Sequence, residues 1–211
     1  MNKLLYVIVA IIALGFGIFI AQKANQTLPP ENALFYEQAR ELKPFELTSH
    51  RDETFSNAEL DGHWSWVFFG YTSCPDVCPT TLQEINFVYD DLKAIAGNTQ
   101  VLLVSVDPLR DTTDKLSQYI QYFNQEFIAL RGGHDVLFPF ARNVGLMYAI
   151  VDEVEKEGYL VDHSASLVLV NPEGKIAAIF KPKHELGQLP TVSGDDLVED
   201  FRKIVELSNH T

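Results

Sequence analysis

Runs of consecutive apolar residues recur along the chain, and stretches with helical spacing separate them. Continuous runs of about four to eight apolar residues are typical of strands that are buried on both faces of a sheet. The clearest runs are Trp64–Gly70 (WSWVFFG) and Gln100–Val106 (QVLLVSV). The other predicted strands are Phe127–Leu130, Met147–Val151, Tyr159–Val161, Ser166–Val170 and Lys175–Lys181.

Apolar residues three and four positions apart predict amphipathic helices between these strands. After the first strand, this spacing predicts a helix at Cys78–Ile95. The next predicted helix is Asp111–Phe123, and we expect Asp111 to cap it, because aspartate accepts hydrogen bonds from the free N–H groups of a first helical turn. A further helix is predicted at His134–Val144, and Ser193 is expected to cap a last one.

The order of these elements is strand, helix, strand, helix, and then a hairpin and a final helix. This order fits a central mixed sheet flanked by helices, and a βαβ unit followed by a ββα unit is the thioredoxin-like arrangement. The sequence therefore predicts an α/β thioredoxin-like domain over residues 45–208. With 211 residues, the chain is long enough for one such domain and an appendage.

The N-terminal appendage begins with a strongly apolar run. Leu4–Ala21 holds 18 consecutive uncharged residues, close to the length that spans a bilayer as a helix. A cleaved signal peptide is the alternative, but its apolar region is usually shorter and ends at a small-x-small cleavage site, which the residues after Ala21 match poorly. We therefore predict a transmembrane helix, acting as a membrane anchor, at residues 1–21 and a polar tether at residues 22–44.

The chain is acidic, with 29 Asp and Glu residues against 16 Lys and Arg residues and a net charge of -13 at pH 7. Such a surface repels phosphate backbones, and the sequence holds no basic patch interleaved with aromatic residues. The charge therefore argues against nucleic-acid binding.

Both cysteines lie in one short stretch, FFGYTSCPDVCPTT at residues 68–81, between the first strand and its helix. Cys74 and Cys78 could form a structural disulfide, a redox pair or part of a metal site. A disulfide across so short a loop removes little chain entropy, so the structural role is the weakest interpretation. The start of a helix lowers the pKa of a nearby thiol, which favours redox chemistry and metal binding alike.

The cysteine spacing and one histidine favour the metal site. Redox thioredoxins have two residues between their cysteines, whereas three separate Cys74 from Cys78. Thioredoxin-like oxidoreductases also carry a cis proline in the loop before the strand predicted at 166–170, where this chain has no proline and offers His163. Two thiolates and one imidazole suit copper, whereas structural zinc normally takes four protein ligands. The alternative for His163 is an ordinary loop residue.

Other polar residues near these positions have two open interpretations each. Asp162 could orient His163 through a hydrogen bond or cap its loop, and Asp76 could add negative charge beside a metal ion or belong to a solvated turn. The remaining histidines lack such a placement, and we interpret them as surface residues: His50, His63, His134, His184 and His210.

Three ordered motifs carry a resemblance to a known family. They are FFGYTSCPDVCPTTL at residues 68–82, SVDPLRDT at 105–112 and YLVDHSASLVLVNPEG at 159–174. In these motifs the chain resembles the Sco/SenC family of membrane-anchored copper proteins, which help to assemble the CuA centre of cytochrome c oxidase. The resemblance runs from about residue 45 to residue 207. It implies that Cys74, Cys78 and His163 are copper ligands, for both Cu(I) and Cu(II).

The second motif contains Asp107, Arg110 and Asp111, whose role the sequence leaves open. In the structural interpretation, Asp107 ends a strand, Asp111 caps a helix and Arg110 pairs with either carboxylate.

The resemblance implies a copper chaperone that delivers copper to, or prepares, the CuA site of a cytochrome c oxidase subunit. Other periplasmic copper chaperones and thioredoxin-like reductases are further candidate partners. The expected location is the inner membrane, in which the chain is single-pass and its domain faces the periplasm. Lys3 and the terminal amine before the apolar run, against Lys23 after it, give this orientation a slight positive-inside bias.

An enzymatic role enters as the alternative function. The resemblance implies that Cys74 and Cys78 could act as a redox pair, so the alternative is a thiol-disulfide oxidoreductase that reduces the cysteines of a copper-site partner. A peroxidase is a third candidate, because Val77-Cys78-Pro79-Thr80 is similar to peroxiredoxins. Those proteins have a threonine three residues before the reactive cysteine, where this chain has Pro75 or Tyr71. The peroxidase is therefore the weakest of the three.

Overall fold

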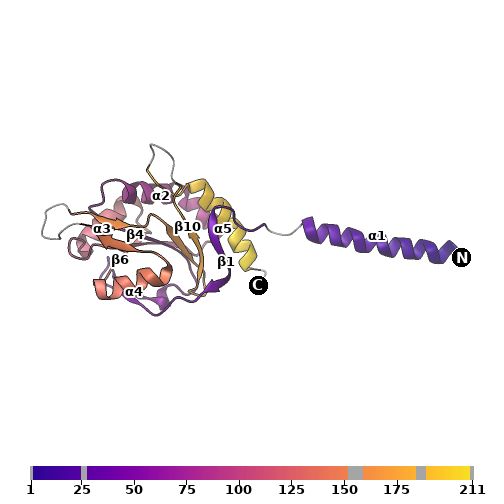
Figure 1. The fold of residues 1–211 in the computed structure, drawn as a ribbon, viewed down its shortest axis with the longest axis horizontal. Coiled ribbons are helices and arrows are strands. Elements are labelled where there is room, and N and C mark those ends of the chain that lie inside the picture. Colours follow the sequence, from indigo (N-terminus) through magenta and orange to yellow (C-terminus); the bar gives the residue numbers. More distant parts are fainter. Residues whose placement is uncertain (1, 25–27, 152–158, 184–188, 210–211) are drawn as a thin grey trace.

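The centre of the molecule is an eight-stranded mixed sheet with strand order β1-β10-β9-β4-β5-β6-β2-β3 (Figure 1). The structure is a computed structural model, and it describes residues 2–24, 28–151, 159–183 and 189–209. The strands of the sheet are β1 (Ala33–Arg40), β2 (Glu46–Ser49), β3 (Thr54–Ser56), β4 (Trp64–Gly70), β5 (Thr99–Ser105), β6 (Ile128–Arg131), β9 (Leu167–Val170) and β10 (Ile176–Phe180).

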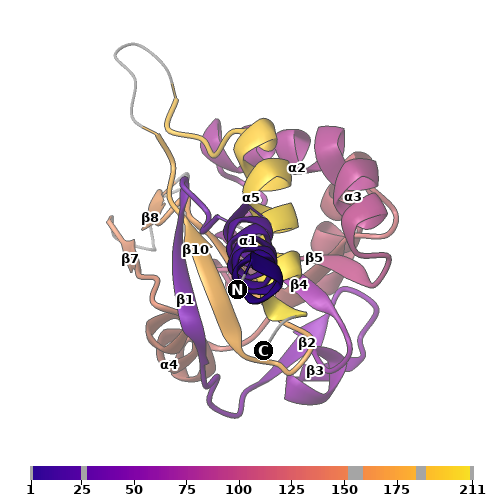
Figure 2. The ribbon, with the colours of Figure 1, turned by 90° about the vertical axis from the view of Figure 1, so that its right-hand side faces the viewer.

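Helices cover both faces of this sheet. Helices α2 and α5 pack against each other on one face, and α4 lies on the opposite face (Figure 1, Figure 2). This arrangement confirms the predicted mixed α/β fold. The helices of the domain are α2 (Val77–Ile95), α3 (Thr113–Phe123), α4 (His134–Val144), α5 (Gly194–Ser208) and the short 3-10 helix η1 (Asn57–Glu59).

Strand β4 is the middle of the core. It runs parallel to β5 and antiparallel to β9, and every one of its residues is buried. A strand with helices on both sides needs apolar residues on both faces, which explains the unbroken run WSWVFFG. The Trp66 ring packs 5.0 Å from Phe180 of β10 and 5.3 Å from Phe201 of α5. The loop after β4 therefore starts from the buried centre of the sheet.

A second, two-stranded sheet lies beside the main one. Strands β7 (Tyr148–Ile150) and β8 (Val161–His163) pair antiparallel, with Tyr148 opposite His163. Both segments were predicted as strands, although β8 begins at the residue where the predicted strand 159–161 ended. Residues 152–158 between them lie outside the described residues. This hairpin brings His163 to the end of β4.

Two helix starts differ from the prediction. Helix α3 begins at Thr113, and its cap is Thr112, whose Oγ1 accepts a hydrogen bond of 3.3 Å from the Lys115 N–H. The prediction that Asp111 caps this helix was wrong, because its carboxylate is buried and accepts other hydrogen bonds, described below. Helix α2 begins at Val77, so Pro79 stands in its first turn, where N–H groups have no helical partner.

The N-terminal border of the domain also lies earlier than residue 45. Strand β1 falls in the segment predicted as a tether and pairs with β10 at the edge of the sheet. Just before it, the N–H groups of Glu31, Asn32 and Ala33 donate hydrogen bonds of 2.6–3.0 Å to the buried carboxylate of Asp200 in α5. The backbone from residue 31 is thus part of the folded domain.

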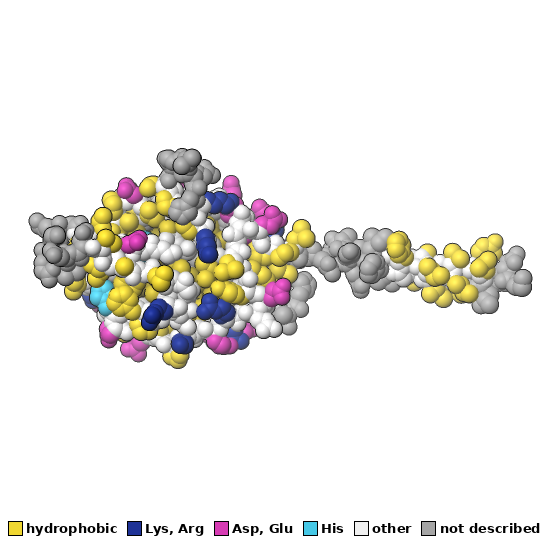
Figure 3. Space-filling model, in the orientation of Figure 1, with side chains coloured by type: hydrophobic (Ala, Val, Ile, Leu, Met, Phe, Trp, Pro, Cys, Tyr) yellow, Lys and Arg dark blue, Asp and Glu magenta, His cyan; other side chains and the backbone are white. Residues whose placement is uncertain are grey.

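The N-terminal segment forms helix α1 (Asn2–Ala24), which Figure 1 shows apart from the domain. The side chains described in it are mostly exposed and hydrophobic, and they give this part of Figure 3 its yellow surface. Within the described ranges, no helix meets the length and hydropathy needed to cross a membrane.

Candidate metal centre

The loop that follows β4 carries both cysteines, and Gly70 at the end of β4 makes room for one of them. A Cβ atom on Gly70 would lie 3.0 Å from the Cys78 sulfur and 3.1 Å from a methyl group of Leu103. Contacts this short would force the sulfur and the methyl group to shift by a few tenths of an ångström. A glycine therefore allows Cys78, which is fully buried in the first turn of α2, to sit directly on the strand end.

Asp111 fixes the loop that carries Cys74. Its carboxylate accepts hydrogen bonds from the Thr72 N–H (3.1 Å), the Thr72 hydroxyl (2.6 Å) and the Ser105 hydroxyl (2.6 Å). Burial raises the pKa of Asp111, while these donors lower it in part. The Cys74 N–H donates to the Tyr71 carbonyl (3.2 Å), which tightens the turn. Cys74 itself is half-buried. The sequence offered Asp111 as a cap, whereas the structure assigns it to the cysteine loop.

His163 reaches the cysteines from β8. Its Nε2 atom lies 3.2 Å from the Cys78 sulfur, and its Nδ1 atom lies 3.3 Å from the Ser164 carbonyl oxygen. When Nδ1 carries the proton, it donates a hydrogen bond to this carbonyl. Nε2 then keeps its lone pair, which can face the Cys78 sulfur or bind a metal ion. The rings of Phe68 and Tyr71 meet the imidazole edge to face and hold its plane.

The three predicted ligands form one cluster. The sulfur atoms of Cys74 and Cys78 and a ring nitrogen of His163 all lie within 4.8 Å of one another, and both cysteines are free. Two ligands on opposite sides of one ion lie about 4.0–4.6 Å apart when the bonds are about 2.0–2.3 Å long, as they are around zinc. A single soft ion therefore fits between these atoms with small side-chain adjustments.

The pKa values of the two cysteine thiols are shifted in opposite directions. The pKa of Cys74 is lowered to about 4, first because the Cys78 thiol donates a hydrogen bond to it and then through His163 and backbone N–H groups. The pKa of Cys78 is raised, first by burial and then by the Cys74 thiolate beside it. Cys74 is thus the thiolate at neutral pH and Cys78 the thiol, and an incoming metal ion must displace one proton.

This asymmetry predicts the alkylation behaviour of the reduced, metal-free protein. We expect iodoacetamide to modify Cys74 first, at a nearly constant rate from about pH 6 to about pH 8, because the thiolate is the nucleophile and a pKa of about 4 leaves it deprotonated throughout. Peptide mass spectrometry measures the rate at each cysteine. In the Cys74→Ser control, the buried Cys78 should react slowly. A Cys74 rate that rises about tenfold per pH unit, as for an ordinary thiol, would contradict the assignment.

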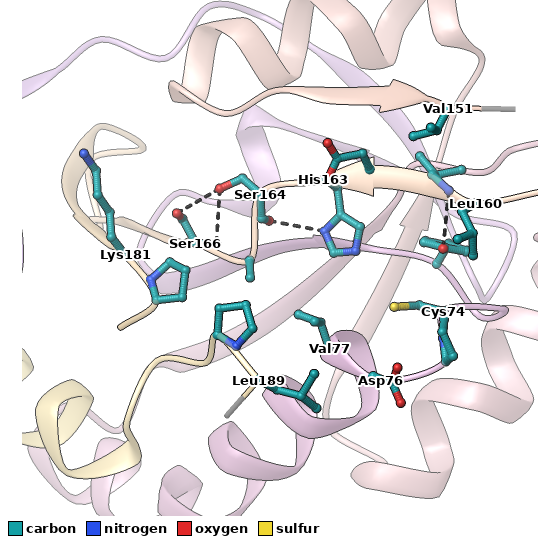
Figure 4. Close-up of a pocket in the computed structure, with 17 residues that line it drawn as sticks. Cys74, Asp76, Val77, Val151, Leu160, His163, Ser164, Ser166, Lys181 and Leu189 are labelled. Carbon is teal, nitrogen blue, oxygen red and sulfur yellow. Dashed lines mark hydrogen bonds between the residues drawn. The ribbon is translucent and has the colours of Figure 1, made fainter. Parts of the chain in front are cut away.

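An open groove gives access to this cluster. It has a volume of about 790 Å³ and runs between β8 and the start of α2. The Cys74 sulfur and the His163 ring point into it (Figure 4). The rest of its lining is largely apolar and includes Val77, Leu160 and Leu189. The ligand cluster is therefore reachable from solvent on the Cys74 and His163 side, while Cys78 forms its buried end.

The other residues that the sequence singled out behave differently. Asp162 is exposed, and the His163 Nδ1 atom lies against the Ser164 carbonyl oxygen, so the interpretation in which Asp162 orients the ring is not supported. Asp76 is exposed at the start of α2, which favours the solvated-turn interpretation.

Of the five histidines predicted on the surface, His63 is exposed. His50 is buried, and the prediction was wrong because its Nδ1 atom accepts a 3.1 Å hydrogen bond from the Ala129 N–H. His134 is partly buried, and its Nδ1 atom lies 2.8 Å from the Tyr148 hydroxyl. His184 and His210 lie outside the described residues.

The comparisons with known proteins agree with this cluster. The family model described as SCO1/SenC matches residues 36–191, which contain all three candidate ligands and nearly the whole sheet. The chain belongs to the SCO1/SenC family. A relative from Stutzerimonas stutzeri, named for copper binding, is 34% identical over 174 residues, which cover 82% of this chain and 85% of that protein.

Other relatives share the same domain. The human mitochondrial SCO1 homologue is 31% identical over 148 residues, 69% of this chain, and the matched part is only 49% of the human protein. The structure of Arabidopsis thaliana ScoI with copper bound matches 80% of this chain and 98% of that one, with a TM-score of 0.68 and 28% identity. Yeast Sco1 with copper bound matches 82% and 90%, with a TM-score of 0.67 and 25% identity.

Proposed function

We propose that this protein binds one copper ion through Cys74, Cys78 and His163 and delivers it to, or prepares, the CuA site of cytochrome c oxidase. The observation that carries the proposal is the approach of two thiol sulfurs and one imidazole nitrogen to within 4.8 Å of one another. Thiolates and imidazole are the donors that copper prefers. The set has only three members, and two of them, Cys74 and His163, line the open groove, which favours an ion that must leave again. Relatives whose structures contain copper support the same cargo.

The alternative is a thiol-disulfide oxidoreductase that reduces the cysteines of its copper-site partner. The lowered pKa of Cys74 supports it, because a half-buried thiolate beside a buried thiol is the arrangement of a nucleophile and its resolving cysteine. One experiment separates the two functions. The full chain in mild detergent is mixed with an oxidase subunit domain that carries an empty CuA site, either reduced or in its disulfide form.

Under the chaperone proposal, copper moves from the copper-loaded protein to the reduced acceptor, and the copper content of the re-isolated acceptor rises as that of the donor falls. Under the reductase alternative, the copper-free reduced protein converts the acceptor disulfide to thiols stoichiometrically, while copper transfer is absent. Failure of both reactions would contradict both functions.

We expect a selective effect of His163→Ala on copper binding. Two thiolates can still hold Cu(I) in linear coordination, so its affinity falls only moderately, whereas Cu(II) prefers nitrogen donors and more ligands. The thiolate-to-Cu(II) absorption should largely vanish, and Cys74 and Cys78 should still form a disulfide. Optical titration of the variant beside the unchanged protein measures this. An unchanged Cu(II) spectrum would mean that His163 is an ordinary loop residue.

We also propose that the N-terminal segment of residues 1–21 anchors the domain in the inner membrane as a single-pass protein, with the domain in the periplasm. The uncharged run Leu4–Ala21 and the exposed hydrophobic side chains of α1 support this proposal (Figure 3). An anchor would keep the copper groove near an oxidase in the same membrane. Fractionation tests it: the protein should stay with membranes after washing with carbonate, and release into the soluble fraction would contradict it.

A further inference from the structure

Asp107, Arg110 and Tyr159 form a cluster beside the copper-ligand set, here called the clamp. The Arg110 guanidinium pairs with one carboxylate oxygen of Asp107, and the Tyr159 hydroxyl donates a hydrogen bond to the other oxygen. The Arg110 guanidinium carbon also lies 3.6 Å from the centre of the Tyr159 ring. Asp107 and Tyr159 are buried, so these contacts are protected from water.

The clamp joins two parts of the chain that are distant in sequence. Asp107 and Arg110 follow β5 in the main sheet. Tyr159 stands 52 residues after Asp107 and two residues before the start of β8. From Tyr159 the backbone runs into β8, whose Val161 N–H donates a 3.3 Å hydrogen bond to the Tyr71 hydroxyl. His163 is the last residue of this strand. The clamp therefore fixes the start of the strand that presents the imidazole.

Tyr71 connects the clamp to the ligands. Its ring centre lies 5.6 Å from the Arg110 guanidinium carbon on one side and 5.8 Å from the His163 ring centre, edge to face, on the other. The cysteine loop, by contrast, has its own support, since Asp111 holds Thr72 through two hydrogen bonds. Loss of the clamp should thus loosen His163 and leave the cysteines in place.

From these contacts we propose that Asp107, Arg110 and Tyr159 are positioning residues that hold His163 over the cysteine pair and so determine the Cu(II) affinity of the site. The inference rests on the proposed copper function. Among the described residues, no contact joins the side chains of the clamp directly to the ligand atoms. The clamp acts through β8. Its loss weakens the binding of Cu(II), because Cu(II) depends on the imidazole more than Cu(I) does.

For Arg110→Ala, a positioning role and a purely electrostatic role predict opposite changes in the affinity for Cu(II). Removing a cation near the site, and leaving the Asp107 carboxylate uncompensated, would raise the affinity for a positive ion if charge alone mattered. If the clamp positions His163, Cu(II) affinity instead falls, by about 10–100-fold, the range known for groups that orient metal ligands. Cu(I) affinity should change much less, because two thiolates suffice for it.

The test compares the full chain in mild detergent with Arg110→Ala and Tyr159→Phe. Tyr159→Phe removes only the hydroxyl that donates to Asp107 and keeps the ring beneath Arg110, so it folds even if Arg110→Ala does not. Lys93→Ala is the matched control, because it removes a cation from the 2.6 Å ion pair with Glu126 near the far end of α2. Competition with buffered chelators gives the Cu(I) and Cu(II) affinities of each protein.

A second readout needs no metal. Hydrogen exchange of the peptide that covers residues 159–165 should become faster in both clamp variants, while the peptide that carries the cysteines keeps its protection. The control variant should match the unchanged protein in every measurement.

A selective fall of Cu(II) affinity together with faster exchange over 159–165 supports the clamp. An unchanged or raised Cu(II) affinity, an equal fall for both oxidation states, or unchanged exchange would overturn it. If the unchanged protein binds no copper, the proposed function fails, and the exchange experiment alone still decides whether the clamp holds β8.

Discussion

We expect Cys74→Ser and Cys78→Ser each to abolish tight Cu(I) binding by the reduced protein, which under the proposed function takes up one copper ion per chain. Cu(I) is a soft ion that needs at least two soft donors, and each variant leaves one thiolate with the imidazole of His163. A serine hydroxyl is a hard, neutral donor that cannot replace the missing sulfur. The expected change is therefore a loss of stoichiometric binding, and it is the same for both cysteines although their burial differs.

Competition against a chromophoric Cu(I) chelator under anaerobic conditions measures this effect. His63→Ala is a suitable control, because His63 is exposed and its recorded contact is to the Asp61 carbonyl, away from the ligand cluster. Stoichiometric tight binding that survives in either cysteine variant would refute a shared site.

Copper should also stabilise the reduced domain against thermal unfolding, and a disulfide should remove that effect. The ligands come from two segments 85 residues apart, so the site exists only in the folded chain and copper shifts the equilibrium by mass action. With free copper about 100-fold above the dissociation constant, the gain is about 2.7 kcal/mol. For a domain of this size, that corresponds to a rise in melting temperature of about 5–11 °C.

A disulfide between Cys74 and Cys78 takes away both thiolates, so copper should leave the melting temperature of the oxidised protein unchanged. The oxidised domain should nevertheless fold, because so short a loop contributes little to stability. Melting curves of the reduced and oxidised protein, each with and without buffered copper, measure both effects. An equal copper-dependent rise in both forms would place the metal at another site.

Much of the domain could be predicted because its central strands are buried on both faces. The run WSWVFFG predicted β4 with its observed bounds, and the spacing of apolar residues predicted α4 in the same way. Strand β1 was missed for the opposite reason. It lies at the edge of the sheet, its residues are exposed or only partly buried, and its sequence ALFYEQAR lacks a clear apolar pattern.

The proximity of the three candidate ligands was predictable because their positions follow from the topology of the fold. The cysteines lie at the junction of a strand and a helix, which sequence shows locally, and His163 lies before the strand that pairs with β4. The contacts that support these three residues could not be predicted from the sequence, because they join segments that are far apart in the chain. Asp111 and Thr72 meet across 39 residues, and Asp107 and Tyr159 across 52. Next to Thr112, Asp111 looked like a cap because both residue types cap helices.

The most direct test of the account is X-ray absorption spectroscopy at the copper edge of the reduced, copper-loaded protein. The three-residue site predicts two sulfur neighbours and one nitrogen neighbour for each copper ion, and the loss of that nitrogen in His163→Ala. A first shell of nitrogen and oxygen atoms alone, or a sulfur shell that stays the same in Cys74→Ser, would contradict it.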